Sequence, residues 1–231
     1  MRLTFVLTFF LVSSLSLLAQ ATPKKDWAKY EKYAEANSLI LRAMEIDSSA
    51  APKVVFMGNS ITELWAKHRP TFFTENSYAA RGISGQTTYQ MLARFQRDVV
   101  DLQPQAVVIL AGINDIAENS GPIALENIAG NIKSMCDIAW ANGIQPILCS
   151  VLPCDYLSWR KDLTPAQDVV ALNLLIQALA EAEGIAYVDY YSRLDNGVGG
   201  LGPEHSDDRC HPNEAGYQIM ENIIQSFLMR L

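Results

Sequence analysis

Short apolar runs alternate with longer segments of helical periodicity along most of the chain. Three of the runs, near Val54, Val107 and Ile147, are almost continuously apolar, which is typical of strands covered by helices on both faces. The predicted strands are 54–57, 77–80, 106–111, 145–151 and 186–189.

Helical periodicity predicts five helices, and glycines mark where two of them should end. Gly143 and Gly184 stand where the chain must leave a helix in a left-handed conformation. The predicted helices are 24–46, 88–102, 124–142, 164–183 and 213–231. Regular alternation of strands and helices predicts one α/β domain built on a parallel sheet.

The first residues have the layout of a secretory signal peptide. Arg2 precedes an apolar run at 3–18 and the small-residue site Ala19-Gln20-Ala21. A membrane anchor is the alternative, but the run is interrupted by Ser and Thr and is shorter than the roughly 20 apolar residues that span a bilayer. We expect residues 1–21 to be removed and residues 22–231 to be exported, to the periplasm or the medium.

The net charge of the chain limits the kinds of molecule that it is expected to bind. The 231-residue chain has a formal net charge of −7, and loss of Arg2, the one charged residue in 1–21, makes it −8. An acidic protein is a poor partner for nucleic acid or anionic membranes.

In an exported chain the four cysteines could form disulfides in three full pairings. We expect Cys136 and Cys149 to be buried thiols, whereas Cys154 and Cys210 fall in predicted loops and could pair.

Polar segments follow the predicted strands, where sites form in parallel sheets. They are Gly58-Asn59-Ser60, the loop 82–88 (GISGQTT), the segment 112–115 (GIND) and the segment 207–213 (DDRCHPN) before the last helix. Taken singly, each has a structural explanation: Ser60 could cap a helix, and the others could be turns or helix starts.

Together these segments supply the groups that acyl transfer needs. A serine nucleophile, Ser60, needs a base, and His211 is the natural one. Asp208, three residues before it, could hold the imidazole in one tautomer. The backbone N–H groups of Ser60 and Gly85 and the side-chain amide of Asn114 are suitable oxyanion donors. We therefore expect Ser60 to be both a cap-like turn residue and the nucleophile.

In these segments the chain resembles the SGNH (GDSL-like) hydrolase family of esterases and lipases. The first family block, Gly-Asp-Ser-(Ile/Leu), matches 58–61 with Asn59 in place of the aspartate. The second-block glycine matches Gly85, the Gly-x-Asn-Asp block matches 112–115, and the Asp-x-x-His-Pro block matches 208–212. The resemblance implies a three-layer α/β/α sandwich on a flavodoxin-like, five-stranded parallel sheet.

The resemblance also implies a catalytic set of Ser60, Asp208 and His211, an oxyanion hole of Ser60, Gly85 and Asn114, and no cofactor or metal. We expect a serine esterase acting on small-molecule or carbohydrate esters, with acetyl groups on carbohydrate favoured for an exported acidic protein. The alternatives are a lysophospholipase or platelet-activating-factor-acetylhydrolase-like lipid esterase, and a non-catalytic carbohydrate-binding module of the same fold. A third alternative is a metal-dependent hydrolase with ligands drawn from His205, Asp207, Asp208 and His211.

Other side chains have two interpretations each. Aromatic residues that could wall a substrate pocket, or simply pack, are Trp65, Tyr156 and Trp159. Arg160 could contact an anionic substrate group or lie on the surface, and His68 and His205 are expected to be solvated loop residues.

Overall fold

Five parallel strands form one central sheet in the order β2-β1-β3-β4-β5. The computed structural model describes residues 26–231, so the predicted signal peptide lies outside the described residues. The strands are β1 Val54–Gly58, β2 Tyr78–Gly82, β3 Ala106–Leu110, β4 Gln145–Cys149 and β5 Ala186–Val188. This is the flavodoxin-like order, and the α/β fold and its five-stranded parallel sheet are confirmed.

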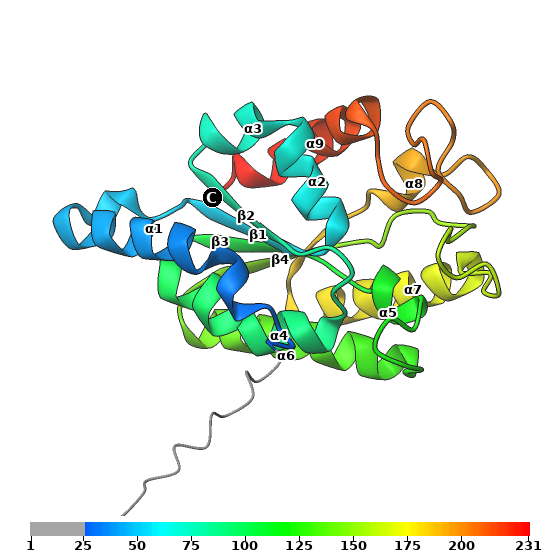
Figure 1. The fold of residues 1–231 in the computed structure, drawn as a ribbon, viewed down its shortest axis with the longest axis horizontal. Helices are drawn as coiled ribbons and strands as arrows, with labels where there is room; N and C mark the ends of the chain where they lie inside the picture. Colours follow the sequence, from blue (N-terminus) through cyan, green and yellow to red (C-terminus); the bar gives the residue numbers. More distant parts are fainter. Residues whose placement is uncertain (1–25) are drawn as a thin grey trace, which may run out of the picture.

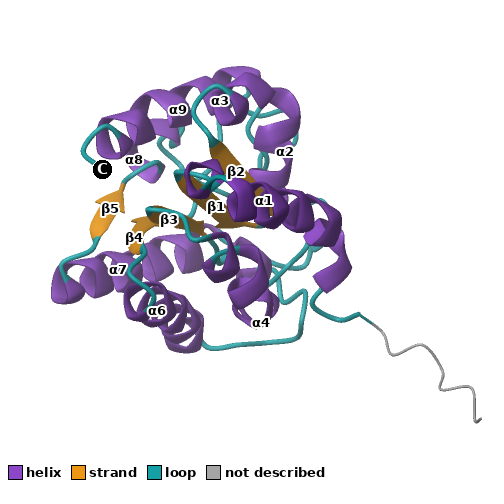
Figure 2. Cartoon of the chain, turned by 90° about the vertical axis from the view of Figure 1, so that its left-hand side faces the viewer, coloured by secondary structure: helices purple, strands orange, loops and turns teal. Residues whose placement is uncertain are grey.

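Helices cover both faces of the sheet. In Figure 1 and Figure 2, α2, α3 and α9 lie on one face, and α4, α6 and α7 on the other. The helices are α1 Ala34–Ile46, α2 Ser60–His68, α3 Pro70–Thr74, α4 Thr88–Asp98, α5 Ile113–Ile116, α6 Leu125–Ala141, α7 Ala166–Glu183, α8 Tyr191–Leu194 and α9 Glu214–Leu228. Three 3-10 turns accompany them: η1 Tyr30–Tyr33, η2 Ser48–Ala50 and η3 Val100–Leu102.

The apolar runs are buried because they lie between these two helical layers. Every residue of β1 and of β3 is buried, and the two strands pair in register, Gly58 opposite Leu110. On its other side Gly58 lies opposite Gly82, the last residue of β2. The carboxyl ends of β1, β2 and β3 therefore lie side by side at one edge of the sheet.

Two predicted helix boundaries are wrong for a local backbone reason. Of the helix expected at 24–46, the described part begins only after Lys29, which has a left-handed backbone with φ 54°, and Tyr33, with φ −113°, separates the turn η1 from α1. The helix expected at 88–102 ends at Asp98, and the non-helical backbone of Val99, with φ −127°, separates it from η3. The short helices α2, α3, α5 and α8 were not expected.

All four cysteines are buried free thiols, including Cys154 and Cys210, for which a disulfide was considered. Among residues 26–231, no helix has the length and apolar character to cross a membrane.

Candidate active site

The polar segments expected to form a site meet at the carboxyl edge of the sheet, where the strand order reverses between β1 and β3. Ser60 is the first residue of α2, two positions after β1 ends. Asn114 lies in α5, just after β3, and Gly85 lies in the loop between β2 and α4. Crevices at such reversal points are the usual ligand sites of doubly wound sheets.

Asn59, and not Ser60, caps helix α2. Its side-chain oxygen accepts a hydrogen bond of 3.1 Å from the backbone N–H of Ile61. The expectation that Ser60 is itself cap-like is therefore wrong: it occupies the first turn of the helix. An amide oxygen can accept this bond as a carboxylate oxygen would. The Asn59 side chain thus does the capping and leaves the Ser60 hydroxyl available.

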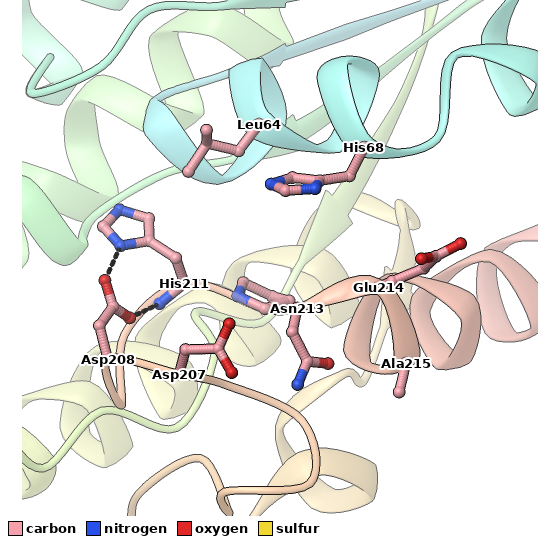
Figure 3. A pocket seen from close by; sticks show the side chains of 9 residues that line it. Leu64, His68, Asp207, Asp208, His211, Asn213, Glu214 and Ala215 are labelled. Atoms are coloured by element: carbon pink, nitrogen blue, oxygen red, sulfur yellow. Dashed lines mark hydrogen bonds and ion pairs between the residues drawn. The ribbon is translucent and has the colours of Figure 1, made fainter.

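The Ser60 hydroxyl lies 2.8 Å from Nε2 of His211, although 151 positions separate the two residues. The other ring nitrogen, Nδ1, lies 2.7 Å from Oδ2 of Asp208. The second carboxylate oxygen of Asp208 accepts the backbone N–H of His211 at 2.7 Å (Figure 3) and that of Cys210 at 3.0 Å. A left-handed turn at Arg209, with φ 69°, folds the chain back so that these bonds can form.

The hydrogen bonds to Asp208 favour its ionised form. Partial burial by itself would raise its pKa, but the bonds from the backbone and ring of His211 and the backbone of Cys210 outweigh that effect. The pKa of Asp208 therefore lies below its ordinary value, and the carboxylate stays negative beside the imidazole.

Ser60, Gly85, Asn114 and His211 line one cavity of about 340 Å³. Its other walls are Leu64, Ser84, Asn119 and Trp159. Gly85 has φ +79°, a conformation that a residue with a side chain adopts only with strain.

The amide of Asn114 is held in one orientation. Its nitrogen donates to the carbonyl of Gln86 at 2.9 Å, and its oxygen accepts from the amide nitrogen of Asn119 at 3.0 Å. Because the nitrogen carries two hydrogens, one is left to point elsewhere.

Helix α2 holds the Gly85 loop through Glu63. One carboxylate oxygen accepts the backbone N–H of Ser84 at 2.7 Å and its hydroxyl at 2.6 Å, and the other pairs with Lys32 at 2.7 Å. Burial alone would raise the pKa of Glu63, but the bonds from Lys32 and Ser84 outweigh it and lower the pKa. The loop is thereby tied to the helix that carries Ser60.

Arg94 of α4 joins the same loop to β1 from the other side. Its guanidinium is fully buried and donates to the Gln86 side chain at 2.6 Å, to the Gly58 carbonyl at 2.9 Å and to Asp98 at 2.8 Å. One side chain therefore fixes the end of the strand before Ser60 and the residue after Gly85.

Asp115 anchors the segment of Asn114 to the start of α4. It accepts the backbone N–H of Thr88 at 3.0 Å and the Thr88 hydroxyl at 2.6 Å. Burial raises the pKa of Asp115 to about 6, against the opposing effect of these bonds.

The remaining candidates lie in different environments. Trp65 packs in the core, with its ring stacked 5.7 Å from that of Tyr217. Trp159 lines the Ser60 cavity, 6.3 Å from the His211 ring, and donates to the Asn119 side chain at 3.0 Å. Arg160 pairs with Glu118 and Asp162.

Neither histidine outside the Ser60 cavity belongs to a metal-ligand cluster. His68 is exposed at the end of α2, so its assignment to a loop is wrong, and His205 lies half-buried in a loop. Within residues 26–231, no three His, Cys, Asp or Glu side chains converge as a ligand set for a metal ion.

Comparison with known proteins places the chain in a family. The sequence profile of the GDSL-like lipase/acylhydrolase family matches residues 56–219, most of the chain. The chain belongs to this family. The predicted family assignment is therefore confirmed.

Solved structures cover most of this family member's length. A GDSL-like lipase from Bacteroides thetaiotaomicron is 43% identical, with a TM-score of 0.82 over 88% of this chain and 98% of that one. A candidate acylhydrolase from Bacteroides fragilis is 42% identical, with a TM-score of 0.83 over 90% and 99%. An acetylxylan esterase mutant from Geobacillus stearothermophilus shares the fold at 18% identity, with a TM-score of 0.63 over 77% and 94%.

One curated protein matches part of the GDSL-like chain. It is the uncharacterized lipoprotein YqeF of Bacillus subtilis, 35% identical over 75 residues, which are 31% of each chain.

Several site residues of this family member have no signal in the sequence. Leu64 and Asn119 line the cavity without belonging to any segment expected to form a site, and Arg94 resembles any basic residue of an amphipathic helix. Only the spacing of Asn119, five positions after Asn114, hints that the two amides meet.

Proposed function

We propose that this protein is a serine esterase that hydrolyses carboxylic esters through an acyl-enzyme. The observation that carries the proposal is the chain of contacts from Ser60 Oγ to His211 Nε2, 2.8 Å, and from His211 Nδ1 to Asp208, 2.7 Å. Gly85 and Asn114 on the wall of the same cavity support it.

In this proposal Ser60 Oγ attacks the ester carbonyl while His211 Nε2 takes its proton. The ionised Asp208 stabilises the resulting imidazolium. The carbonyl oxygen becomes an oxyanion that accepts hydrogen bonds from the N–H groups of Ser60 and Gly85 and from the Asn114 amide. Collapse breaks the ester bond, and His211 gives its proton to the leaving alkoxide. Water, deprotonated by His211, then attacks the acyl-enzyme. Collapse breaks the bond between the acyl carbon and Ser60 Oγ, His211 returns the proton to Oγ, and the acid is released.

The size of the Ser60 cavity favours short acyl groups. Its volume is about 340 Å³, and Leu64 and Trp159 are among its walls. A long acyl chain would extend out of this space, whereas an acetyl group would occupy only a small part of it. We therefore favour an acetyl esterase over a lysophospholipase.

Export completes the proposal. The layout of residues 1–21 supports a cleaved signal peptide, and one partial relative is named a lipoprotein. Secretion of the full chain from a bacterial host should yield a protein whose first residue by N-terminal sequencing is Thr22. Retention of the apolar run in the exported protein would contradict cleavage.

The test of the proposed chemistry is labelling by a fluorophosphonate, which reacts with activated serines. The wild-type protein should be labelled at Ser60 and should hydrolyse phenyl acetate, and Ser60→Ala and His211→Ala should each lose nearly all of both activities. Ser134→Ala, a half-buried serine on α6 that does not line the Ser60 cavity, is the matched control and should behave as wild type. An unlabelled Ser60 in folded protein would instead favour the non-catalytic binding module.

A further inference from the structure

A second cavity, of about 510 Å³, adjoins the Ser60 cavity and shares two of its walls, Leu64 and His211. It lies between α2 and the loop that leads into α9 (Figure 3). The remaining wall residues are His68, Asp207, Asp208, Pro212, Asn213, Glu214 and Ala215. None of the expected oxyanion donors lines it.

The direction of proton delivery gives this second cavity a role. The carbonyl oxygen must point at Gly85 and Asn114, whereas the leaving oxygen must lie within hydrogen-bonding distance of Nε2 of His211. The group attached to the leaving oxygen therefore extends past His211. The cavity that touches His211, and not Gly85 or Asn114, is the space available to it.

We propose that the second cavity is an alcohol subsite, and that it takes an uncharged, hydroxyl-rich alcohol such as a sugar. The inference rests on the proposed esterase function and specifies the substrate of that same site. Its central residues are Asp207 and His68, which belong to opposite walls of the cavity, the loop before α9 and the helix α2.

Both side chains are available to hydroxyl groups. Among residues 26–231, the carboxylate of Asp207 has no hydrogen-bond or ion-pair partner, and the same holds for the ring nitrogens of His68. The His68 ring is stacked on Tyr217, 6.0 Å between centroids and 25° between planes, which fixes its orientation. A carboxylate accepts hydroxyl hydrogens, and a neutral imidazole both donates and accepts.

The wall chemistry argues against other kinds of alcohol. Asp207, Asp208 and Glu214 line the cavity, and no Lys or Arg does, so a phosphate or carboxylate on the alcohol would be repelled. A quaternary ammonium is recognised by aromatic faces, and no Phe, Tyr or Trp is among the wall residues. A lipid chain would leave the carboxylates facing hydrocarbon.

The experiment compares acetate esters of four alcohols that differ in charge and in hydroxyl content. They are a methyl glucoside acetylated at one hydroxyl, cyclohexyl acetate, acetylcholine and 3-acetoxypropionate. Wild-type kcat/KM should be highest for the glucoside ester and lowest for the anionic ester. Asp207→Ala and His68→Ala should each lower kcat/KM on the glucoside ester about tenfold, and change it less than about twofold on cyclohexyl acetate, because only the sugar loses a hydrogen bond. Asp207→Asn, whose amide oxygen can still accept a hydrogen bond from a hydroxyl group, should lower kcat/KM on the glucoside ester less than Asp207→Ala does.

Glu204→Ala is the matched control, since it removes an exposed carboxylate of the same loop that does not line the cavity. This variant should leave kcat/KM unchanged on all four esters. The subsite would be overturned, with the esterase left intact, if Asp207→Ala and His68→Ala lowered kcat/KM equally on the glucoside and cyclohexyl esters, or lowered it on neither. A wild-type preference for acetylcholine or for the anionic ester would overturn it as well. Failure of every ester to be hydrolysed in a Ser60-dependent manner would overturn both proposals.

Discussion

Asn59 is the residue at which this chain departs from the family motif, and its contact shows that the cap of α2 is kept. The motif places an aspartate before the serine, and here a buried amide accepts the Ile61 N–H in its place. Both side chains offer one oxygen to the first turn of α2, so the capping geometry does not depend on the charge.

Asn59→Ala should lower the free energy of unfolding by about 1 kcal/mol, because the first turn of α2 loses its cap. Asn59→Asp keeps an acceptor oxygen and should retain the cap. Urea denaturation of the two variants beside wild type measures the difference. Equal stabilities of the alanine and aspartate variants would show that the Ile61 contact contributes nothing.

Asn114 is the side-chain donor expected to meet the developing oxyanion. Asn114→Ala should lower kcat on phenyl acetate by about 10²–10³ with a smaller change in KM, because the bond strengthens only in the transition state. Steady-state kinetics separate the change in kcat from the change in KM. Asn222→Ala, an exposed amide on α9, serves as the control and should show wild-type values. A loss confined to KM would assign Asn114 to ground-state binding.

Helix α4 supports the site through a charge that it buries completely. Arg94→Met would leave the Asp98 carboxylate without its guanidinium, and should lower the free energy of unfolding by about 3–5 kcal/mol. Arg97→Met, on the exposed side of the same helix, should cost less than about 1 kcal/mol, since its nearest carboxylate, on Glu31, lies 3.9 Å away in solvent. Urea denaturation of Arg94→Met and Arg97→Met measures the two changes in the free energy of unfolding. Similar losses in both variants would contradict a special role for the buried charge.

The elements differ in how far the sequence could predict them. Strands β1, β3 and most of β4 were found because burial on both faces makes them apolar runs, whereas the partly buried edge strands β2 and β5 stood out only as short segments between helical ones. Helices α6 and α7 were found because they are long enough to show a period. Helices α2 and α5 were missed because they begin within two or three residues of a strand, and α5 has only four residues. Their existence is decided by caps and by packing against the sheet, which periodicity does not report.

For the molecule as a whole, the buried carboxylate of Asp115 links stability to pH. Its pKa is about 6 when folded, against 3.8 for an unperturbed aspartate. Between these values the folded protein holds a proton that the unfolded chain has released, so this group's contribution to stability falls as pH rises through this window. Below pH 3.8 both states are protonated, and the contribution is fully present and no longer changes with pH. From pH 4 to pH 7 the wild type should lose roughly 2 kcal/mol relative to Asp115→Asn.

Urea melts of wild type and Asp115→Asn at pH 4 and pH 7 give that difference directly. Taking the difference cancels other groups, such as Asp208, whose lowered pKa acts in the opposite direction. A gap between the two proteins that does not change with pH would contradict the raised pKa of Asp115.

The sequence predicted which groups could form a site more completely than it predicted their surroundings. Ser60, Asp208 and His211 were chosen because the proposed chemistry needs an alcohol, an acid and a base, and the fold brings them into contact. Trp159 was a candidate wall residue, but the extent of the two cavities was not foreseen, since their walls come from α2, α5, α9 and several loops. Which side chains face a common space depends on the tertiary arrangement, and no local pattern encodes it.

The 151 positions between Ser60 and His211 have a consequence for biosynthesis. The first three strands and the groups at their ends are translated long before the imidazole, which enters only with the last loop and the docking of α9. A nascent chain stalled after β5, or a product clipped ahead of residue 205, would hold most of the sheet and yet have no base. If the proposed chemistry holds, turnover of an ester is an assay for completed synthesis and closure of the chain.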